Sequence, residues 1–128
     1  SVPVLLSDGC ASVTMCSPST PGLRVTTGQA DILVVEVGIP LFIQPDMVKP
    51  GAVVIDAGQN VVPTGNARRG AWRSVGDVDF DGVSTQALAV SPVPGGIGPV
   101  VVAMLLSNTL EAARRLTGSG AVIGTGAD

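Results

Sequence analysis

The sequence of 128 residues contains no histidine and no tyrosine, and its only lysine is Lys49. These absences exclude a histidine-based catalytic triad, histidine metal ligands and a tyrosine acid or base. Aromatic side chains are also few, since Phe42, Trp72 and Phe80 are the complete set. The hydrophobic fraction of 45% therefore depends on valine, alanine, leucine and isoleucine. This composition predicts one small globular domain with an aliphatic core, because domains commonly contain about 100–150 residues.

Charge and hydropathy exclude two classes of partner. The net charge is −3, and the seven basic residues are scattered apart from Arg68, Arg69 and Arg73 and the pair Arg114 and Arg115. Such a chain offers no basic surface to a nucleic acid. Each apolar run is interrupted before it reaches the roughly 18–20 residues that a membrane helix needs. We therefore expect neither a nucleic-acid partner nor membrane insertion.

The two cysteines, Cys10 and Cys16, favour a reducing compartment. They are not spaced as Cys-x-x-Cys and have no companions, so two reduced thiols are favoured over a local disulfide. We expect an intracellular protein, in the mitochondrial matrix or the cytoplasm. The chain begins at Ser1 rather than methionine, which indicates a processed product or a portion of something longer.

Four apolar runs predict strands. Asp31–Val37 and Ala52–Ala57 are nearly unbroken β-branched runs that stop at glycine, the pattern of strands buried in a parallel sheet. Ser12–Cys16 and Gln86–Ser91 predict shorter strands. Val100–Leu116 predicts the one long helix, because its apolar residues recur with helical spacing. Strands separated by loops, with a helix closing the chain, indicate an α/β fold.

The segments between these runs predict turns and loops. Asp46–Lys49 forms at most one helical turn, and Gly76–Phe80 pairs briefly. Gly65–Arg73 has no periodicity and predicts a solvated excursion, while Pro92–Pro99 is too rich in proline and glycine for regular structure. In α/β sheets ligands bind at the carboxyl ends of the strands. Several glycines follow the predicted strands, where a missing side chain lets a ligand approach the backbone: Gly38, Gly58, Gly95, Gly96 and Gly98.

Several of these segments carry family motifs. The motifs are Ser12–Cys16 with Thr20, Ala30–Pro40, Asp46–Asn60, Val75–Phe80 and Ser91–Pro99, followed by Ala103-Met-Leu-Leu and Asn108-Thr109. In this order they resemble the nucleotide-binding half of the bifunctional methylenetetrahydrofolate dehydrogenase/methenyltetrahydrofolate cyclohydrolases. The resemblance covers Pro3 to Leu116, and its most specific element is the proline-glycine loop.

The resemblance implies an incomplete Rossmann-type fold, a doubly wound parallel sheet that lacks its first strand and phosphate loop. Residues 1–116 would form this partial NAD(P)-binding domain, and residues 117–128 a flexible glycine-rich tail. The implied cofactor is NADP or NAD, and the implied substrate is a tetrahydrofolate. In the family the nicotinamide accepts a hydride from 5,10-methylenetetrahydrofolate, and water then opens the methenyl product.

The resemblance also places site residues. Residues near the adenosine ribose would be Cys16, Ser17 and Thr20, and Val37 and Gly38 would lie along the dinucleotide. Residues near the nicotinamide side would be Asp56, Gly58 and Asn60, with Gly98 and Val101 also on the cofactor. The substrate side would be lined by Pro94, Gly95, Gly96 and Ile97.

For Gly38 and Gly58 alone, making a turn is the better interpretation. Asp56 either contacts a ribose or cofactor amide or is a solvated carboxylate.

The chain departs from the family pattern at positions that bear on binding. Family members usually carry His-Ser where this chain has Ser17-Pro18, and a threonine where it has Val101. Gln59 stands at a usually aliphatic position, and Thr64–Ala71 resembles an insertion. These departures weaken phosphate recognition and remove one polar contact to the cofactor. Nucleotide binding could therefore have been lost.

The family's catalytic Tyr-x-x-x-Lys pair belongs to a folate domain that these residues do not include. We therefore assign no catalytic residue and no metal ligand, and expect the chain alone to be inactive. The first Rossmann strand lies centrally, so without it two strands would be left unpaired. We expect a segment or subunit to complete the sheet, within an oligomer or larger complex.

Two hypotheses remain open, with a third that is weaker. The chain is either the nucleotide-binding part of a split or processed enzyme, or a degenerate relative that serves as a structural subunit. A free-standing nucleotide-binding module is the weaker reading, because no phosphate loop remains. Lys49 is expected to be a solvated surface residue. The alternating carboxylates Asp77, Asp79 and Asp81 are expected to form a solvated edge rather than a cation site.

Overall fold

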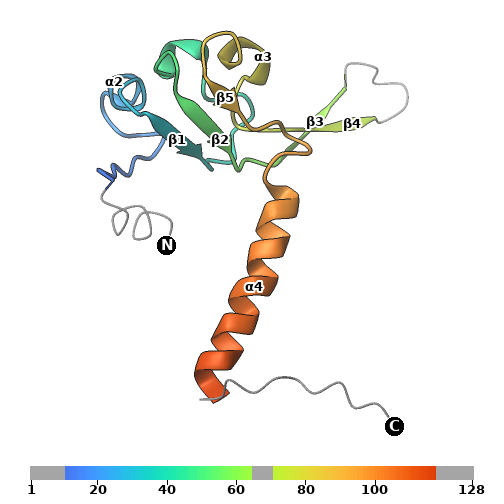
Figure 1. The fold of residues 1–128 in the computed structure, drawn as a ribbon. Helices are drawn as coiled ribbons and strands as arrows, with labels where there is room; N and C mark the ends of the chain where they lie inside the picture. Colours follow the sequence, from blue (N-terminus) through green and yellow to red (C-terminus); the bar gives the residue numbers. More distant parts are fainter. Residues whose placement is uncertain (1–10, 65–70, 118–128) are drawn as a thin grey trace.

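The computed structural model of the chain describes residues 11–64 and 71–117. Its centre is a three-stranded sheet in the order β1 (Ile32–Val35), β2 (Val53–Asp56) and β5 (Ala89–Val90) (Figure 1). Both strand pairs are parallel. The α/β class and three of the four predicted strands are confirmed, because β1, β2 and β5 lie inside the apolar runs that predict them.

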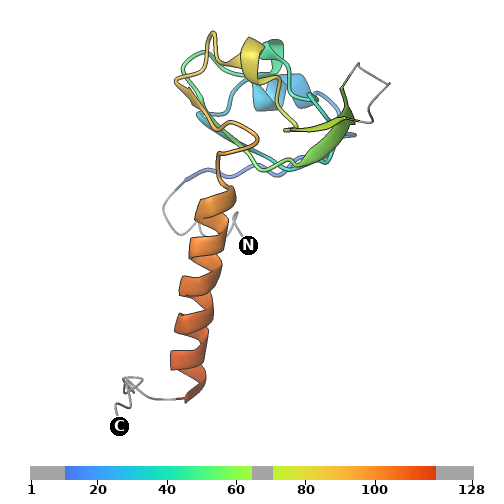
Figure 2. The same cartoon turned by 90° about the vertical axis from the view of Figure 1, so that its right-hand side faces the viewer.

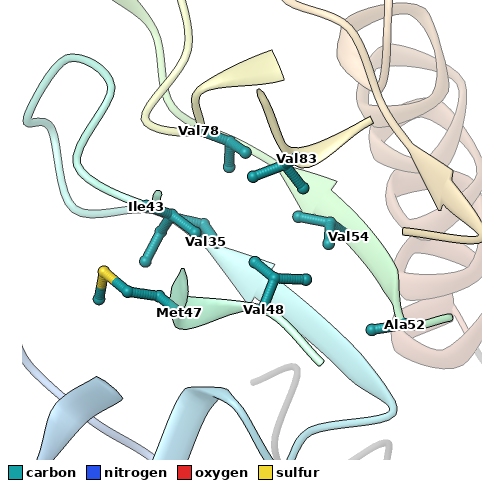
Figure 3. Packing of buried hydrophobic residues seen from close by; sticks show 8 residues of the cluster. All are labelled: Val35, Ile43, Met47, Val48, Ala52, Val54, Val78 and Val83. Atoms are coloured by element: carbon teal, nitrogen blue, oxygen red, sulfur yellow. The ribbon is translucent and has the colours of Figure 1, made fainter. Parts of the chain in front are cut away.

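The core lies against one face of this sheet and is entirely aliphatic. Its buried members include Val54 and Val83, which are 1% and 0% exposed, and none is aromatic. Figure 3 shows the eight clustered side chains: Val35, Ile43, Met47, Val48, Ala52, Val54, Val78 and Val83. Ile43 and Val78 also form a parallel bridge, which is the brief pairing predicted for Gly76–Phe80. Small β-branched side chains thus fill the space that aromatic residues occupy in many cores.

Three short helices lie on the core side of the sheet (Figure 1): α2 (Leu23–Thr27), η1 (Pro45–Met47) and α3 (Phe80–Val83). The single turn of η1 agrees with the prediction for Asp46–Lys49. The other face of β1 carries Ile32 and Val34, whose side chains alternate with the buried ones and remain 55% and 43% exposed. The helices therefore cover one face of the sheet, and on the other face the apolar side chains of β1 are exposed.

The prediction of a strand at Ser12–Cys16 is wrong. Residues 11–16 have no strand or helix and no ladder partner among the described residues. A strand exists only through hydrogen bonds to a neighbour, and β1 is the edge strand of the sheet. The resemblance described above implies a first Rossmann strand in the middle of the sheet. Without that neighbour in the described part of the chain, residues 11–16 have nothing to pair with.

A hairpin that the sequence did not predict projects from the sheet (Figure 1). Its strands β3 (Asn60–Pro63) and β4 (Trp72–Val75) pair in antiparallel fashion. Beyond them, Thr64 N–H donates to the Ala71 carbonyl at 2.9 Å. The excursion predicted for Gly65–Arg73 is solvated where it is described, since Trp72 and Arg73 are exposed, but these two residues belong to a regular strand, and residues 65–70 lie outside the described part of the chain. Val61 and Trp72 are 66% and 64% exposed, whereas Val75 at the end of β4 is buried, so the outer part of the hairpin depends on backbone hydrogen bonding.

The long helix α4 (Gly98–Thr117) confirms the helix predicted over Val100–Leu116. Figures 1 and 2 show it running away from the sheet, and none of its residues is buried. Apolar side chains such as Leu105 and Leu106 are 64% and 68% exposed. None of the helices described here is both long enough and apolar enough to span a membrane. The predicted tail at 117–128 falls outside the described residues after Thr117.

A matched pair of valine substitutions tests the position of the core. Val54→Ala should lower the free energy of unfolding by about 2 kcal/mol, because it removes two buried methyl groups and leaves a cavity. Val61→Ala removes the same atoms from a side chain that is 66% exposed, so its effect should stay within about 0.5 kcal/mol. Urea unfolding of the protein as isolated measures both. Equal effects of the two substitutions would contradict this core.

Candidate functional site

The candidate site lies where the three parallel strands end, because parallel strands place their carboxyl ends at one edge of a sheet. Val37 and Gly38 follow β1, Gly58 follows β2, and Ser91 follows β5. Two aspartates, Asp56 at the end of β2 and Asp77 after β4, connect these chain segments. The structure therefore brings the central part of the predicted site together.

Asp77 is the most buried charged residue described, with 0% exposure. Its Oδ2 atom accepts hydrogen bonds from the backbone N–H groups of Val37 at 2.6 Å and Gly38 at 2.9 Å. Its Oδ1 atom accepts one from the Asn60 side-chain amide at 2.7 Å. Asp77 thus joins the turn after β1 to the first residue of the hairpin. The expectation that it belongs to a solvated edge is wrong.

The surroundings of Asp77 favour its charged form. Burial acts to raise its pKa, because an ionised carboxylate is costly away from water. Hydrogen bonds from the Asn60 amide and from the backbone of Val37, Gly38 and Ile39 outweigh burial and lower the pKa below its ordinary value. Asp77 is therefore a buried anion that the protein's own donors stabilise.

Asp56 is 3% exposed, so the solvated alternative for this residue is wrong. Its Oδ1 atom accepts from the backbone N–H groups of Gly58 at 2.8 Å and Asp77 at 3.1 Å, and its Oδ2 atom accepts from Val78 at 3.0 Å. Its own backbone N–H donates to the Ser91 hydroxyl at 2.8 Å. Asp56 turns its carboxylate inward and joins β2 to Asp77 and to the start of the proline-glycine loop.

Three glycines at or near this network leave no room for a side chain: Gly58 and Gly96, which were predicted, and Gly76, which was not. A Cβ atom on Gly58 would lie 2.2 Å from Cγ of Asp77, and one on Gly76 would lie 1.8 Å from Oδ2 of Asp56. A Cβ atom on Gly96 would lie 2.3 Å from the Pro92 carbonyl oxygen. At Gly58 the space left by the missing side chain is filled by a carboxylate, so room for a ligand does not explain this glycine.

Other predicted glycines do leave open space. Gly38, Gly95 and Gly98 have no heavy atom within 4 Å of a built Cβ. Gly38 and Gly95 also have φ values of +72° and +99°, which side chains rarely tolerate. The Val93–Pro94 peptide in the same loop is cis. These three glycines are the predicted positions at which a ligand could approach the backbone closely.

The turn at Cys16–Thr20 forms a second part of the predicted site. The Ser17 hydroxyl lies 3.0 Å from that of Ser19 and 3.3 Å from that of Thr20, whose oxygen also accepts from the Ser17 N–H at 2.8 Å. Cys16 and Ser17 are exposed. Within the described ranges, no hydrogen bond joins this turn to Asp56 or Asp77. The structure therefore leaves it as a separate group of hydroxyls.

The remaining predicted residues are accessible. Pro94 is exposed, Ile97 is half-buried, and Val101 in the first turn of α4 is 53% exposed. Lys49 confirms its surface prediction: 45% of its side chain is exposed, and it forms an ion pair with Asp31 at 2.6 Å. The hydrogen bond from Lys49 and the positive charge of its ammonium group both lower the pKa of the Asp31 carboxyl group.

Sequence reasoning missed three parts of the network, which are Asp77, Gly76 and Ser91. The signal for Asp77 was the flanking Val75 and Val78, because a carboxylate between β-branched residues is carried into the interior with them. The glycine directly before it was the second signal. Ser91 had no distinguishing signal, since its role depends on the register of β2 and β5.

Comparison with known proteins gives a consistent result. The family model described as tetrahydrofolate dehydrogenase/cyclohydrolase, NAD(P)-binding domain, matches residues 1–117. Bifunctional protein FolD 1 of Myxococcus xanthus is 55% identical over 105 residues, which are 82% of this chain and 36% of that protein. Bifunctional protein FolD of Chlorobium chlorochromatii is 49% identical over 113 residues, which are 88% of this chain and 38% of that protein.

Solved structures show the same fold. The methylenetetrahydrofolate dehydrogenase-cyclohydrolase of Trypanosoma brucei, complexed with NADP and an inhibitor, is 38% identical with a TM-score of 0.79. The match covers 92% of this chain and 40% of that one. The 5,10-methylenetetrahydrofolate dehydrogenase of the silkworm Bombyx mori is 44% identical with a TM-score of 0.70, over 85% of this chain and 35% of that one. The chain therefore spans little more than a third of the length of these relatives.

The lowered pKa of Asp77 predicts a stability that depends on pH. Between the folded pKa and the ordinary aspartate value of about 3.9, the unfolded chain binds a proton that the folded chain does not. The contribution of Asp77 is therefore complete above about pH 5 and is lost as the pH falls through this range. Asp77→Asn should cost about 1–3 kcal/mol at neutral pH, because it places an amide donor against other donors.

Urea unfolding at about pH 7 and about pH 3 measures this contribution. The difference in the free energy of unfolding between the unchanged protein and Asp77→Asn should shrink at the lower pH. Asp79→Asn is the matched control, because Asp79 accepts from Gly82 N–H at the start of α3 and asparagine caps helices equally well. A difference that does not change with pH would contradict a charged, hydrogen-bonded Asp77.

Proposed function

Because the chain belongs to the tetrahydrofolate dehydrogenase/cyclohydrolase family through its NAD(P)-binding domain, we propose that it is the nucleotide-binding part of a methylenetetrahydrofolate dehydrogenase/cyclohydrolase. Under this proposal the chain holds NADP, or NAD, against a tetrahydrofolate bound by another domain. The observation that carries the proposal is the open backbone at Gly38, Gly95 and Gly98, beside the carboxyl edge of the parallel sheet.

The residues at this edge fit a dinucleotide. A flat nicotinamide needs backbone without side chains beside it, and Gly38 and Gly95 offer this with positive φ values. Among the described residues, the hydroxyls of Ser17 and Thr20 bond only to each other and to near neighbours, so they suit contact with a ribose. When bound, the nicotinamide would supply a hydride acceptor for the folate substrate.

Within this proposal the residues of the chain bind the dinucleotide and orient it against the folate. Val37 and Gly38 would lie along the dinucleotide, and Gly98 and Val101 would contact it from the start of α4. Pro94, Gly95, Gly96 and Ile97 would separate the nicotinamide from the folate. Asp56, Gly58 and Asn60 would act mainly through the positions of the turns, because both Asp56 oxygens already accept backbone hydrogen bonds. Proton transfer would come from another domain, since the chain has no tyrosine.

The exposed face and edge of β1 support the proposal that another segment completes the sheet. Ile32 and Val34 expose an apolar face of β1, and this strand is also the edge of its sheet. In the same region, residues 11–16 have no ladder partner among the described residues. A parallel strand between them and β1, followed by a helix on Ile32 and Val34, would satisfy both requirements. We assign this segment to the part of the relatives that the chain does not match.

A second function is favoured by a different observation. The helix α4 carries no buried residue, and its first two turns are apolar on every side, from Val100 to Leu106. A helix that is apolar all round needs cover on all sides. Together with Ser17-Pro18 and Val101, which depart from the family pattern, this surface suits a non-catalytic subunit held in a larger assembly. Both functions require a partner, but only the first requires nucleotide binding.

Nucleotide binding together with the identity of the partner separates the two functions. We expect the protein isolated from its native source to bind NADP or NAD with a Kd in about the micromolar range by calorimetry. We expect mass spectrometry to find a Tyr-x-x-x-Lys folate domain in the same protein or in a companion. Absence of nucleotide binding, with unrelated proteins in fixed stoichiometry, would overturn the enzymatic function and leave the structural one.

A pair of lysine substitutions tests the completing segment. Val34→Lys should lower the free energy of unfolding of the complete protein by about 2–4 kcal/mol, because it forces a charge under the proposed cover. Val25→Lys is the control, since Val25 on α2 is 67% exposed on the side of the sheet that already carries helices. Thermal unfolding compares the two variants. Equal midpoints would show that the face of β1 is not covered.

A further inference from the structure

The turn after β1 is shaped as an anion-binding concavity. The successive backbone N–H groups of Val37 and Gly38 both donate to the Asp77 carboxylate, at 2.6 and 2.9 Å. Gly38 has a φ of +72°. Successive N–H groups that converge around a left-handed residue form a recognised binding site for anions. In this protein the anion is an internal side chain.

We propose that Asp77 is a positioning residue for the nucleotide: its carboxylate holds the Val37–Gly38 turn in the conformation that receives the dinucleotide. This inference rests on the proposed function, because it concerns the same site. Asp77 does not touch the dinucleotide, since it is 0% exposed behind the turn. It acts by fixing the backbone, and the open side of Gly38 is left for the ligand.

A second carboxylate fixes Asp77 in turn. Asp56 accepts from the N–H of Asp77 at 3.1 Å and from that of Val78 at 3.0 Å, so it sets the backbone that carries the Asp77 side chain. Asn60 adds a hydrogen bond to Oδ1 from the opposite side. Both carboxylates are closely confined, because a Cβ atom on Gly58 or Gly76 would overlap with them. These contacts therefore hold the Val37–Gly38 turn in one conformation.

This arrangement assigns the N–H groups of the turn to Asp77 rather than to the nucleotide. A phosphate group would compete with Asp77 for the same donors, and the carboxylate holds them at short distances. The dinucleotide would meet the outer side of the turn, where Gly38 has no Cβ. The contribution of Asp77 to binding is thus preorganisation, which lowers the entropy that ligand binding must overcome.

The test uses Asp77→Asn, which keeps the shape and replaces one acceptor oxygen by a donor. Either orientation of the new amide places its NH2 group against the N–H groups of Val37 and Gly38 or against the Asn60 amide. In the nucleotide-free complete protein, amide hydrogen exchange at Val37 and Gly38 should become about tenfold faster or more. Asp79→Asn is the control and should leave these two amides unchanged, because Asp79 bonds within α3.

Calorimetry on the complete protein gives the second readout. The Kd for NADP should rise about tenfold in Asp77→Asn, as expected if the turn adopts its binding conformation about one tenth of the time. It should not change in Asp79→Asn. A role in stability alone would speed the exchange of all globally protected amides to a similar extent, including those of β2, and would leave the Kd unchanged at temperatures where the variant is folded. Unchanged exchange and an unchanged Kd in Asp77→Asn would overturn the inference.

The outcomes also separate the inference from the proposed function. If the unchanged complete protein does not bind NADP or NAD, the proposed function fails, and with it this role of Asp77. If it binds and Asp77→Asn binds equally well, only the inference fails. If Asp77→Asn does not fold, amide hydrogen exchange in the unchanged protein tests the inference instead. The Val37 and Gly38 amides should be protected before NADP is added and stay protected afterwards, whereas unprotected amides would overturn the inference.

Discussion

The burial of two aspartate side chains, Asp56 and Asp77, is the constraint on which the rest of the site depends. A buried polar group without a hydrogen-bond partner is costly, so the oxygens of both side chains must find donors. Those donors are backbone N–H groups from three parts of the chain, together with the Asn60 amide. The ends of β1 and β2 and the entry to the hairpin can satisfy them only when they meet. One electrostatic requirement therefore sets the geometry of the functional edge.

The sequence predicts the elements whose stability is local or follows from hydrophobic pattern. β1 and β2 lie within long apolar runs, α4 contains the whole predicted helical run, and the aliphatic core follows from the scarcity of aromatic residues. The hairpin could not be predicted, because Val61 and Trp72 are exposed and show no burial pattern. The strand expected at Ser12–Cys16 failed for the opposite reason, since its apolar pattern is present but no neighbouring strand lies among the residues that the structure describes.

The candidate site was predictable in position but not in its internal connections. The glycine and proline clusters indicate the carboxyl edge, and Gly38, Gly95 and Gly98 do leave open backbone there. The roles of the aspartates depend on which segments meet in three dimensions, and residue type alone does not show this. Asp77 looks like its neighbour Asp79 in the sequence, although one is 0% exposed and the other begins a short helix. Tertiary pairing separates them.

The close approach of Gly58 and Asp77 also has a consequence for how this surface can change over time. With only 2.2 Å between a built Cβ and the carboxylate carbon, a side chain at position 58 and a carboxylate at position 77 exclude each other. Neither residue can be substituted alone, so the two positions should vary as a pair among related proteins. A chain that has abandoned nucleotide binding could still retain both, because the fold needs them before any ligand does.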